Sequence, residues 1–256
     1  MNKPKIIFLG TSASVPSKIR DNTSLLFVYG KGYFLVDCPG AVVQKLKRVN
    51  VDFRKIDKVI LTHHHPDHTY GIVSLIHCLL YSNSKITIFS NNHTNDLVRK
   101  LVVLFKLNGK NFPQLKYVNV FSKEFFYDVE GIKIKAVRNK HVRESFGVSF
   151  NFKDKSVLYS SDTAISKNIL ENSKDCYCLI HDCTASSVFF NKHPQLYRVH
   201  TDSFTLARVF LSTNIKKIIP IHFLESSYRE MRTINKELKI LGDRVFIPTD
   251  FQTTLL

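Results

Sequence analysis

The chain has 256 residues, enough for one large domain or two small ones, and its 44% hydrophobic content is ordinary for a globular protein. No apolar run approaches the roughly 20 residues that a transmembrane helix needs. The apolar run at residues 6–9 is also shorter than the roughly 7–15 residues of a secretory signal core. These features argue against a membrane or secreted protein, and we expect a cytoplasmic one.

The formal net charge is +16. Such a charge favours a polyanionic partner such as RNA, but the lysines are scattered and a biased Lys, Asn and Ile composition explains it equally well. The five cysteines, an odd number, show no CxxC spacing, which indicates neither a disulfide framework nor a Cys-type zinc site.

The first half of the chain alternates short β-rich runs with helical patterns. Strands are expected at residues 5–9, 24–29, 33–36, 59–61 and 85–89. Helices are expected at residues 41–48, 70–80 and 95–107.

The second half is strand-rich and then helical. Strands are expected at residues 115–120, 132–137, 148–152, 157–160, 178–180 and 218–221, with a turn at 153–155. Helices are expected at residues 204–211 and 228–241. The order β-rich, α, β-rich, α predicts an α/β fold, a four-layer αββα sandwich with two packed sheets and helices outside, formed by residues 1–256 as one domain.

The stretch VILTHHHPDHTYGI, residues 59–72, follows a predicted strand directly. His63 and His65 are two positions apart, so an extended backbone places both on one side. Asp67 and His68 follow as the chain turns into a helix, whereas His64 should point away. Imidazole and carboxylate together suit zinc and similar divalent metals.

Further candidate ligands follow other predicted strands. His141, Asp162 and His222 each come where an apolar run meets a loop. Alone, each could be an exposed or capping polar residue. Together with the cluster they give seven candidate ligands, too many for one tetrahedral zinc, so two divalent ions are expected, zinc first and manganese second. His77, His93 and His193 are given no role.

The HxHxDH motif resembles that of the metallo-β-lactamase superfamily. The segments FLGTSASVPS, HVRESFGVSF, YSSDT, LIHDCT, VHTDSFTLARVF and IIPIHF occur in the same order in ribonuclease Z-like proteins. This resemblance implies one metal held by His63, His65 and His141, and a second held by three further residues. Those are Asp67, His68 and His222, with Asp162 bridging both ions. It also implies a catalytic part for Asp67, and a homodimer.

The same resemblance assigns two residues beside the metals. His200 matches a histidine that assists phosphodiester cleavage, and Asp182 matches a carboxylate that orients it. The alternative is that His200 only begins a helix capped by Thr201 or Asp202.

The sequence departs from ribonuclease Z in several places. Ribonuclease Z cuts the 3′ trailer from precursor tRNA, and its usual form carries a tRNA-binding arm between the residues matching His141 and Asp162. Here that interval is too short for an arm. Ser161 also replaces a glycine, Asp182 replaces a glutamate, Thr201-Asp202 replaces Ser-Thr, and the stretch DCPGAVVQKL differs.

These patterns predict a metal-dependent phosphodiesterase that hydrolyses small, cyclic or RNA phosphodiesters with a water activated by two metals. A tRNA 3′-processing endonuclease of the ribonuclease Z type is the alternative. A third hypothesis is an inactive nucleic-acid-binding or structural homologue, which should lack some ligands. A β-lactamase or thioesterase of this fold would not be expected to carry His200 in its motif.

Overall fold

The computed structural model describes residues 4–129, 131–153, 155–224 and 227–256. Their strands form two sheets. The first has the order β13 (Thr253–Leu255), β1 (Lys5–Gly10), β2 (Ser24–Tyr29), β3 (Gly32–Val36), β4 (Lys58–Ile60), β5 (Lys85–Ser90) and β6 (Gln114–Asn119). The second has the order β12 (Lys217–Ile221), β11 (Cys178–Asp182), β10 (Ser156–Tyr159), β9 (Phe146–Phe152), β8 (Ile132–Arg138) and β7 (Tyr127–Val129).

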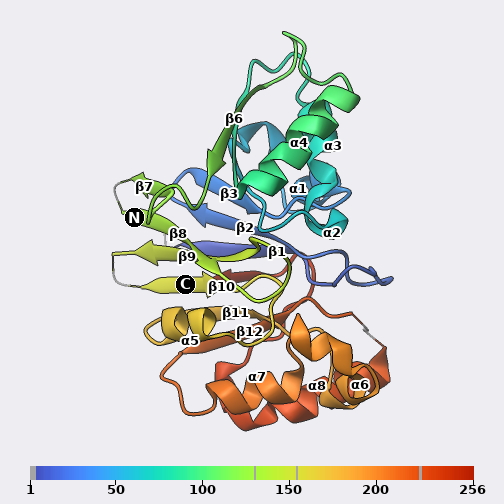
Figure 1. The fold of residues 1–256 in the computed structure, drawn as a ribbon, viewed down its shortest axis with the longest axis vertical. Coiled ribbons are helices and arrows are strands. Elements are labelled where there is room, and N and C mark those ends of the chain that lie inside the picture. Colours follow the sequence, from blue (N-terminus) through green and yellow to red (C-terminus); the bar gives the residue numbers. More distant parts are fainter. Residues whose placement is uncertain (1–3, 130, 154, 225–226) are drawn as a thin grey trace.

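Helices lie outside both sheets (Figure 1). On the side of the first sheet they are α1 (Val42–Arg48), α2 (Pro66–Thr69), α3 (Gly71–Cys78) and α4 (Asn92–Leu104). On the side of the second they are α5 (Lys167–Ser173), α6 (Ser187–Lys192), α7 (Ser203–Phe210) and α8 (Tyr228–Leu238). Short 3₁₀ turns occur at Phe53–Lys55, Pro194–Arg198 and Lys239–Arg244. The αββα sandwich predicted from the sequence is therefore confirmed.

The strands are apolar on both faces because both faces are covered. In β1, Ile6 and Phe8 point into the core between the sheets, whereas Ile7 and Leu9 pack with the helices of the first sheet. Across the central core, Phe27 of one sheet stacks on Phe150 of the other with ring centroids 3.8 Å apart. Each fully buried side chain of this size contributes about 1.5–3 kcal/mol.

Strand direction brings the expected site residues to one edge. β3, β4 and β5 are parallel, and so are β10, β11 and β12. β8 runs in the same direction as β10, because each is antiparallel to β9. The residues that follow β4, β8, β10, β11 and β12 therefore leave the two sheets at the same end of the sandwich.

Two predicted helices differ from the structure by three residues at one end or both, and the others by one or two. α4 begins at Asn92, three residues early, because the side chain of Asn91 accepts a hydrogen bond from the Thr94 N–H (2.7 Å) and caps it. α8 ends at Leu238, after which the chain continues as a 3₁₀ turn containing Gly242 at φ 61°.

Several short elements were not predicted, among them α5, α6, β7 and β13. The two helices are short, and each begins after a serine that caps it, Ser166 and Ser186. The predicted turn at 153–155 includes position 154, which lies outside the described residues. Within the described ranges, no helix is both long enough and apolar enough to cross a membrane.

Candidate metal centre

The loop after β4 carries the histidine cluster, and its local geometry follows from the sequence. His65 has extended dihedrals and precedes Pro66, which begins α2 and places Asp67 and His68 in its only full turn. Gly71 begins α3 next, where a Cβ would lie 1.8 Å from the Pro39 carbonyl oxygen. The loop is therefore held tightly against the start of α1.

The first group of candidate ligands joins His63, His65, His141 and Asp162. His65 Nδ1 lies 3.1 Å from His63 Nε2 and 3.2 Å from His141 Nε2. Asp162 Oδ2 is 3.7 Å from the Nε2 atoms of both His63 and His141. One ion could therefore contact three imidazoles and a carboxylate from three separate segments.

The second group joins Asp67, His68 and His222, and Asp162 lies against it as well. Asp162 Oδ1 is 3.4 Å from His68 Nε2, and Asp162 Oδ2 is 3.1 Å from His222 Nε2. Asp67 Oδ2 is 3.5 Å from His68 Nε2. Asp162 therefore lies against both groups, because its Oδ2 faces His63 and His141 of the first group as well as His222 of the second.

The histidines outside the cluster have other neighbours. The His64 ring contacts the His93 ring, with centroids 4.7 Å apart, and neither belongs to a candidate ligand group. His77 lies near Phe112, and His193 lies against Phe189.

Burial and neighbouring charges shift the pKa values of residues in the cluster. Burial lowers the pKa of His141 to about 4 and holds that of His63 well below its usual value. Burial also opposes the charged forms of His222 and Asp162. Their attraction outweighs it, raising the pKa of His222 to about 10 and holding that of Asp162 well below its usual range.

Three buried nitrogen and oxygen atoms at the centre of the cluster are suited to bind a metal ion. His68 Nε2, Asp162 Oδ1 and His222 Nε2 are buried, and none has a hydrogen bond among the described residues. Buried polar atoms in proteins almost always have a hydrogen-bond partner, so atoms without one indicate a bound ion or water. Imidazole nitrogens and carboxylate oxygens that converge in this way fit divalent transition metals.

A second layer of polar residues holds these candidate ligands, and the sequence analysis missed it. Asp37 is fully buried and accepts hydrogen bonds from His68 Nδ1 (2.8 Å), the Thr62 N–H and hydroxyl, and the Tyr159 hydroxyl. The Ser161 hydroxyl donates to Thr62 Oγ1 (2.8 Å). Asp37 orients His68, as carboxylates do for metal-binding histidines. Its position after β3, in the Asp-Cys pair, was the available signal.

Backbone strain marks the same place. Asp37, Ser161 and His222 have φ values of 59°, 54° and 71°, in the left-handed region that non-glycine residues rarely occupy. Ser161 stands where the resemblance expects a glycine, and its φ gives the reason for that preference. The surrounding hydrogen bonds hold these three residues in place.

His200 and Asp182 meet beside the cluster. His200 Nδ1 lies 2.7 Å from Asp182 Oδ2, and that oxygen also accepts from the Thr163 N–H (2.9 Å). His200 has a candidate ligand atom within 4.8 Å of those of Asp162 and His222. Asp202, the alternative cap, does cap α7, so His200 precedes the helix and remains free for another role.

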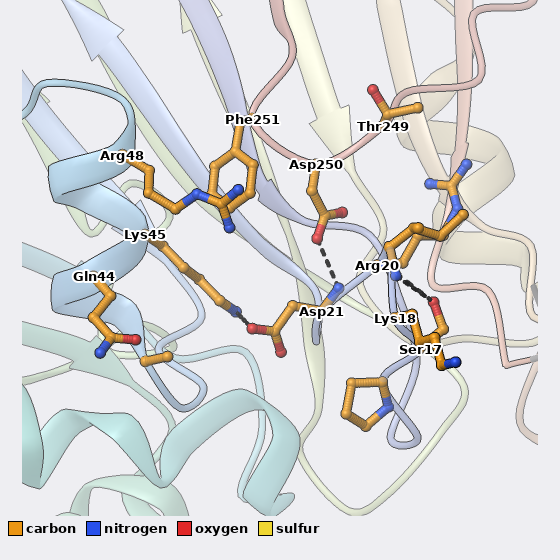
Figure 2. Close-up of a pocket in the computed structure, with 13 residues that line it drawn as sticks. Ser17, Lys18, Arg20, Asp21, Gln44, Lys45, Arg48, Thr249, Asp250 and Phe251 are labelled. Atoms are coloured by element: carbon orange, nitrogen blue, oxygen red, sulfur yellow. Dashed lines mark hydrogen bonds and ion pairs between the residues drawn. The ribbon is translucent and has the colours of Figure 1, made fainter.

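A pocket of about 670 Å³ lies between α1 and two loops, and it contains none of the expected site residues (Figure 2). The buried Lys45 of its wall is paired, with Nζ 3.2 Å from Asp21 Oδ2, and Asp250 accepts from the Asp21 N–H. Asp250 also accepts from the Thr11 hydroxyl, while the Thr11 carbonyl accepts from the His222 N–H. We interpret the wall as support for the segment carrying His222.

Comparison with known proteins places this geometry in a family. The family model described as Anti-Pycsar protein Apyc1 matches residues 4–250, nearly the whole chain. The chain belongs to the Apyc1 family. The predicted similarity to the metallo-β-lactamase superfamily and its ribonuclease Z-like branch is confirmed by further relatives.

The ribonuclease Z of Archaeoglobus fulgidus is 21% identical over 299 residues, covering 97% of this chain and 96% of that protein. The aligned length exceeds the 256 residues of this chain, so the relative contains residues that this Apyc1-family chain lacks.

Two solved structures share the fold. The metallo-β-lactamase fold protein YhfI of Bacillus subtilis has a TM-score of 0.83 at 20% identity, covering 99% of each chain. Short-form human tRNase Z has a TM-score of 0.78 at 20% identity, covering 98% of each chain. With its His/Asp cluster, this member of the Apyc1 family is a metal-dependent hydrolase of the phosphodiesterase or ribonuclease Z type.

Proposed function

We propose that the protein hydrolyses small phosphodiesters, cyclic nucleotides among them, with two divalent ions of which zinc is the first choice. His63, His65 and His141 hold one ion, and a second trio holds the other. That trio is Asp67, His68 and His222, with Asp162 shared. We also propose a cytoplasmic homodimer.

Divalent ions in such a site activate water and neutralise the charge of the phosphate. The protein's own groups supply the proton. Asp182 accepts the Nδ1–H of His200, which leaves Nε2 as the ring nitrogen that faces a substrate. An imidazolium held this way stabilises the developing charge or gives its Nε2 proton to the leaving oxygen.

The observation that carries the substrate proposal is the hairpin between His141 and Asp162. β9 and β10 fill this interval and pair with each other, Ser156 opposite Asn151. No described residue there extends beyond the sheet as an arm. Without a surface that reaches outward, an enzyme gains little binding energy from distant parts of a large substrate.

We expect two ions per chain. Elemental analysis of protein saturated with zinc and freed of excess should give two, because seven converging ligands exceed the needs of one tetrahedral ion. The variant His193→Ala, which alters an exposed histidine outside the cluster, should also retain two. A single ion at saturation would contradict the two-ion assignment.

We expect a cyclic nucleotide monophosphate to be hydrolysed with a kcat/KM at least equal to that for a precursor tRNA. The comparison belongs at near-physiological salt, because scattered lysines bind RNA mainly at low salt. Steady-state kinetics on both substrates make the measurement. A clear preference for precursor tRNA, with one cut after the discriminator base, would overturn the substrate proposal.

Processing of tRNA 3′ ends remains the second candidate because of the net charge of +16 and the ribonuclease Z relatives. A basic surface would then replace the arm. An inactive homologue is disfavoured, because all seven ligand positions are filled by His or Asp and their side chains converge.

A further inference from the structure

Asp182 accepts hydrogen bonds through both of its carboxylate oxygens. Oδ2 accepts from His200 Nδ1 and from the Thr163 N–H. Oδ1 accepts from the hydroxyl of Thr184 at 2.7 Å. Thr184 Oγ1 in turn lies 3.4 Å from His222 Nδ1. A single buried carboxylate is therefore connected both to His200 and, through Thr184, to His222.

The direction of these hydrogen bonds follows from the carboxylate. Asp182 is fully buried, and its Oδ1 has Thr184 as its only side-chain donor among the described residues. An unpaired buried carboxylate oxygen is costly, so the Thr184 hydrogen points to Asp182. The lone pairs of Thr184 then face His222 Nδ1, which must carry a hydrogen. His222 Nε2 is left to face the cluster, where it has no hydrogen bond.

The backbone fixes Thr184 between the two histidines. Its N–H donates to the Thr201 carbonyl, one residue after His200. Its carbonyl accepts from the Leu224 N–H, two residues after His222. Thr184 is 1% exposed, so its hydroxyl is held away from bulk water. The His200 and His222 rings lie nearly parallel, with centroids 5.4 Å apart.

We infer that Thr184 is a positioning residue, which holds the Nδ1–H of His222 and so turns Nε2 toward the metal. This inference rests on the proposed function, because it takes His222 as a ligand. Mutation of a group that hydrogen-bonds the second nitrogen of a metal-binding histidine usually lowers metal affinity or activity by about 10–100-fold.

The test compares zinc affinity, measured by competition with a chelator, in three variants. Thr184→Val keeps the shape and removes the hydroxyl, and it should weaken binding of the more labile zinc by about 10–100-fold. Thr184→Ser keeps the hydroxyl and should restore affinity to near the wild-type value. Thr23→Val is the matched control, because Thr23 is also buried and its hydroxyl donates only to the Ser12 carbonyl (2.8 Å).

A second step shows through which residue Thr184 acts. In the His222→Gln background, Thr184→Val should cause no further loss of zinc affinity, whereas in the His200→Ala background the full loss should remain. The His222 Nδ1–H proton in ¹⁵N-histidine-labelled, zinc-loaded protein should exchange slowly in wild type and Thr184→Ser, and rapidly in Thr184→Val.

Two results would overturn the inference. One is wild-type zinc affinity in Thr184→Val, and the other is an equal loss in Thr184→Val and Thr23→Val, which would indicate general damage. A different result would contradict the proposed function, in which His222 is a zinc ligand: His222→Gln alone would then bind zinc as tightly as wild type.

Discussion

Asp162→Ala should lose both zinc ions and lower turnover by about a thousandfold or more, since bound metals supply several kcal/mol of transition-state stabilisation. Asp162 contacts both candidate groups, with Oδ1 toward His68 and Oδ2 toward His63, His141 and His222. Without it, both candidate groups lose a buried anionic ligand, and nothing at that position offsets the charge of two cations in a buried place. Elemental analysis and steady-state kinetics make the measurement.

The controls separate charge from shape. Asp162→Asn keeps the size of the side chain and should also lose metal, because an amide is a poor bridge between two cations. Asp175→Ala changes an exposed carboxylate and should retain both ions. Two ions in Asp162→Ala would show that Asp162 is not the shared ligand.

His200→Ala should lower turnover by about a hundredfold or more, the usual scale for a lost acid–base group. Zinc content should stay near normal, because His200 is proposed to act through its bond with Asp182 and not as a ligand. Steady-state kinetics and elemental analysis on the same preparation give both values. Asp182→Asn should reduce turnover in the same direction, since it alters the group that holds His200 Nδ1.

The exposed His193 supplies a matched control, and His193→Ala should keep full turnover. Loss of zinc together with turnover in His200→Ala would mean that His200 itself binds metal. Its candidate ligand atom lies within 4.8 Å of those of Asp162 and His222. The assignment of the acid would then have to move to another residue.

The candidate ligands could be predicted because each follows a predicted strand. His141, Asp162 and His222 come after β8, β10 and β12, whose shared direction places their ends together. Polar residues at such positions are visible in a sequence as an apolar run that stops at a histidine or aspartate. The fold class was predicted for a similar reason, from the order of strands and helices.

The groups that hold the ligands could not be predicted in the same way. Thr184 and His222 are far apart in the chain, and so are Asp37 and Tyr159, so their contacts exist only in the folded protein. Threonine, serine and tyrosine are common residues with no spacing rule that marks such a role. Short elements were missed for a related reason: β13 has three residues and forms by pairing with β1.

The position of the cluster on both sheets has a consequence for folding. The first sheet carries four of the candidate ligands in the loop after β4, namely His63, His65, Asp67 and His68. The second sheet carries the other three after β8, β10 and β12, namely His141, Asp162 and His222. Ions bound here would act as cross-links between two sheets that otherwise meet through apolar packing and through hydrogen bonds such as that from Tyr159 to Asp37. At a free concentration a thousand times its Kd, one ion adds about 4 kcal/mol to the free energy of unfolding. Chelation should therefore lower the melting temperature and first loosen the end of the sandwich that carries the site, while the aromatic stack of Phe27 on Phe150 persists.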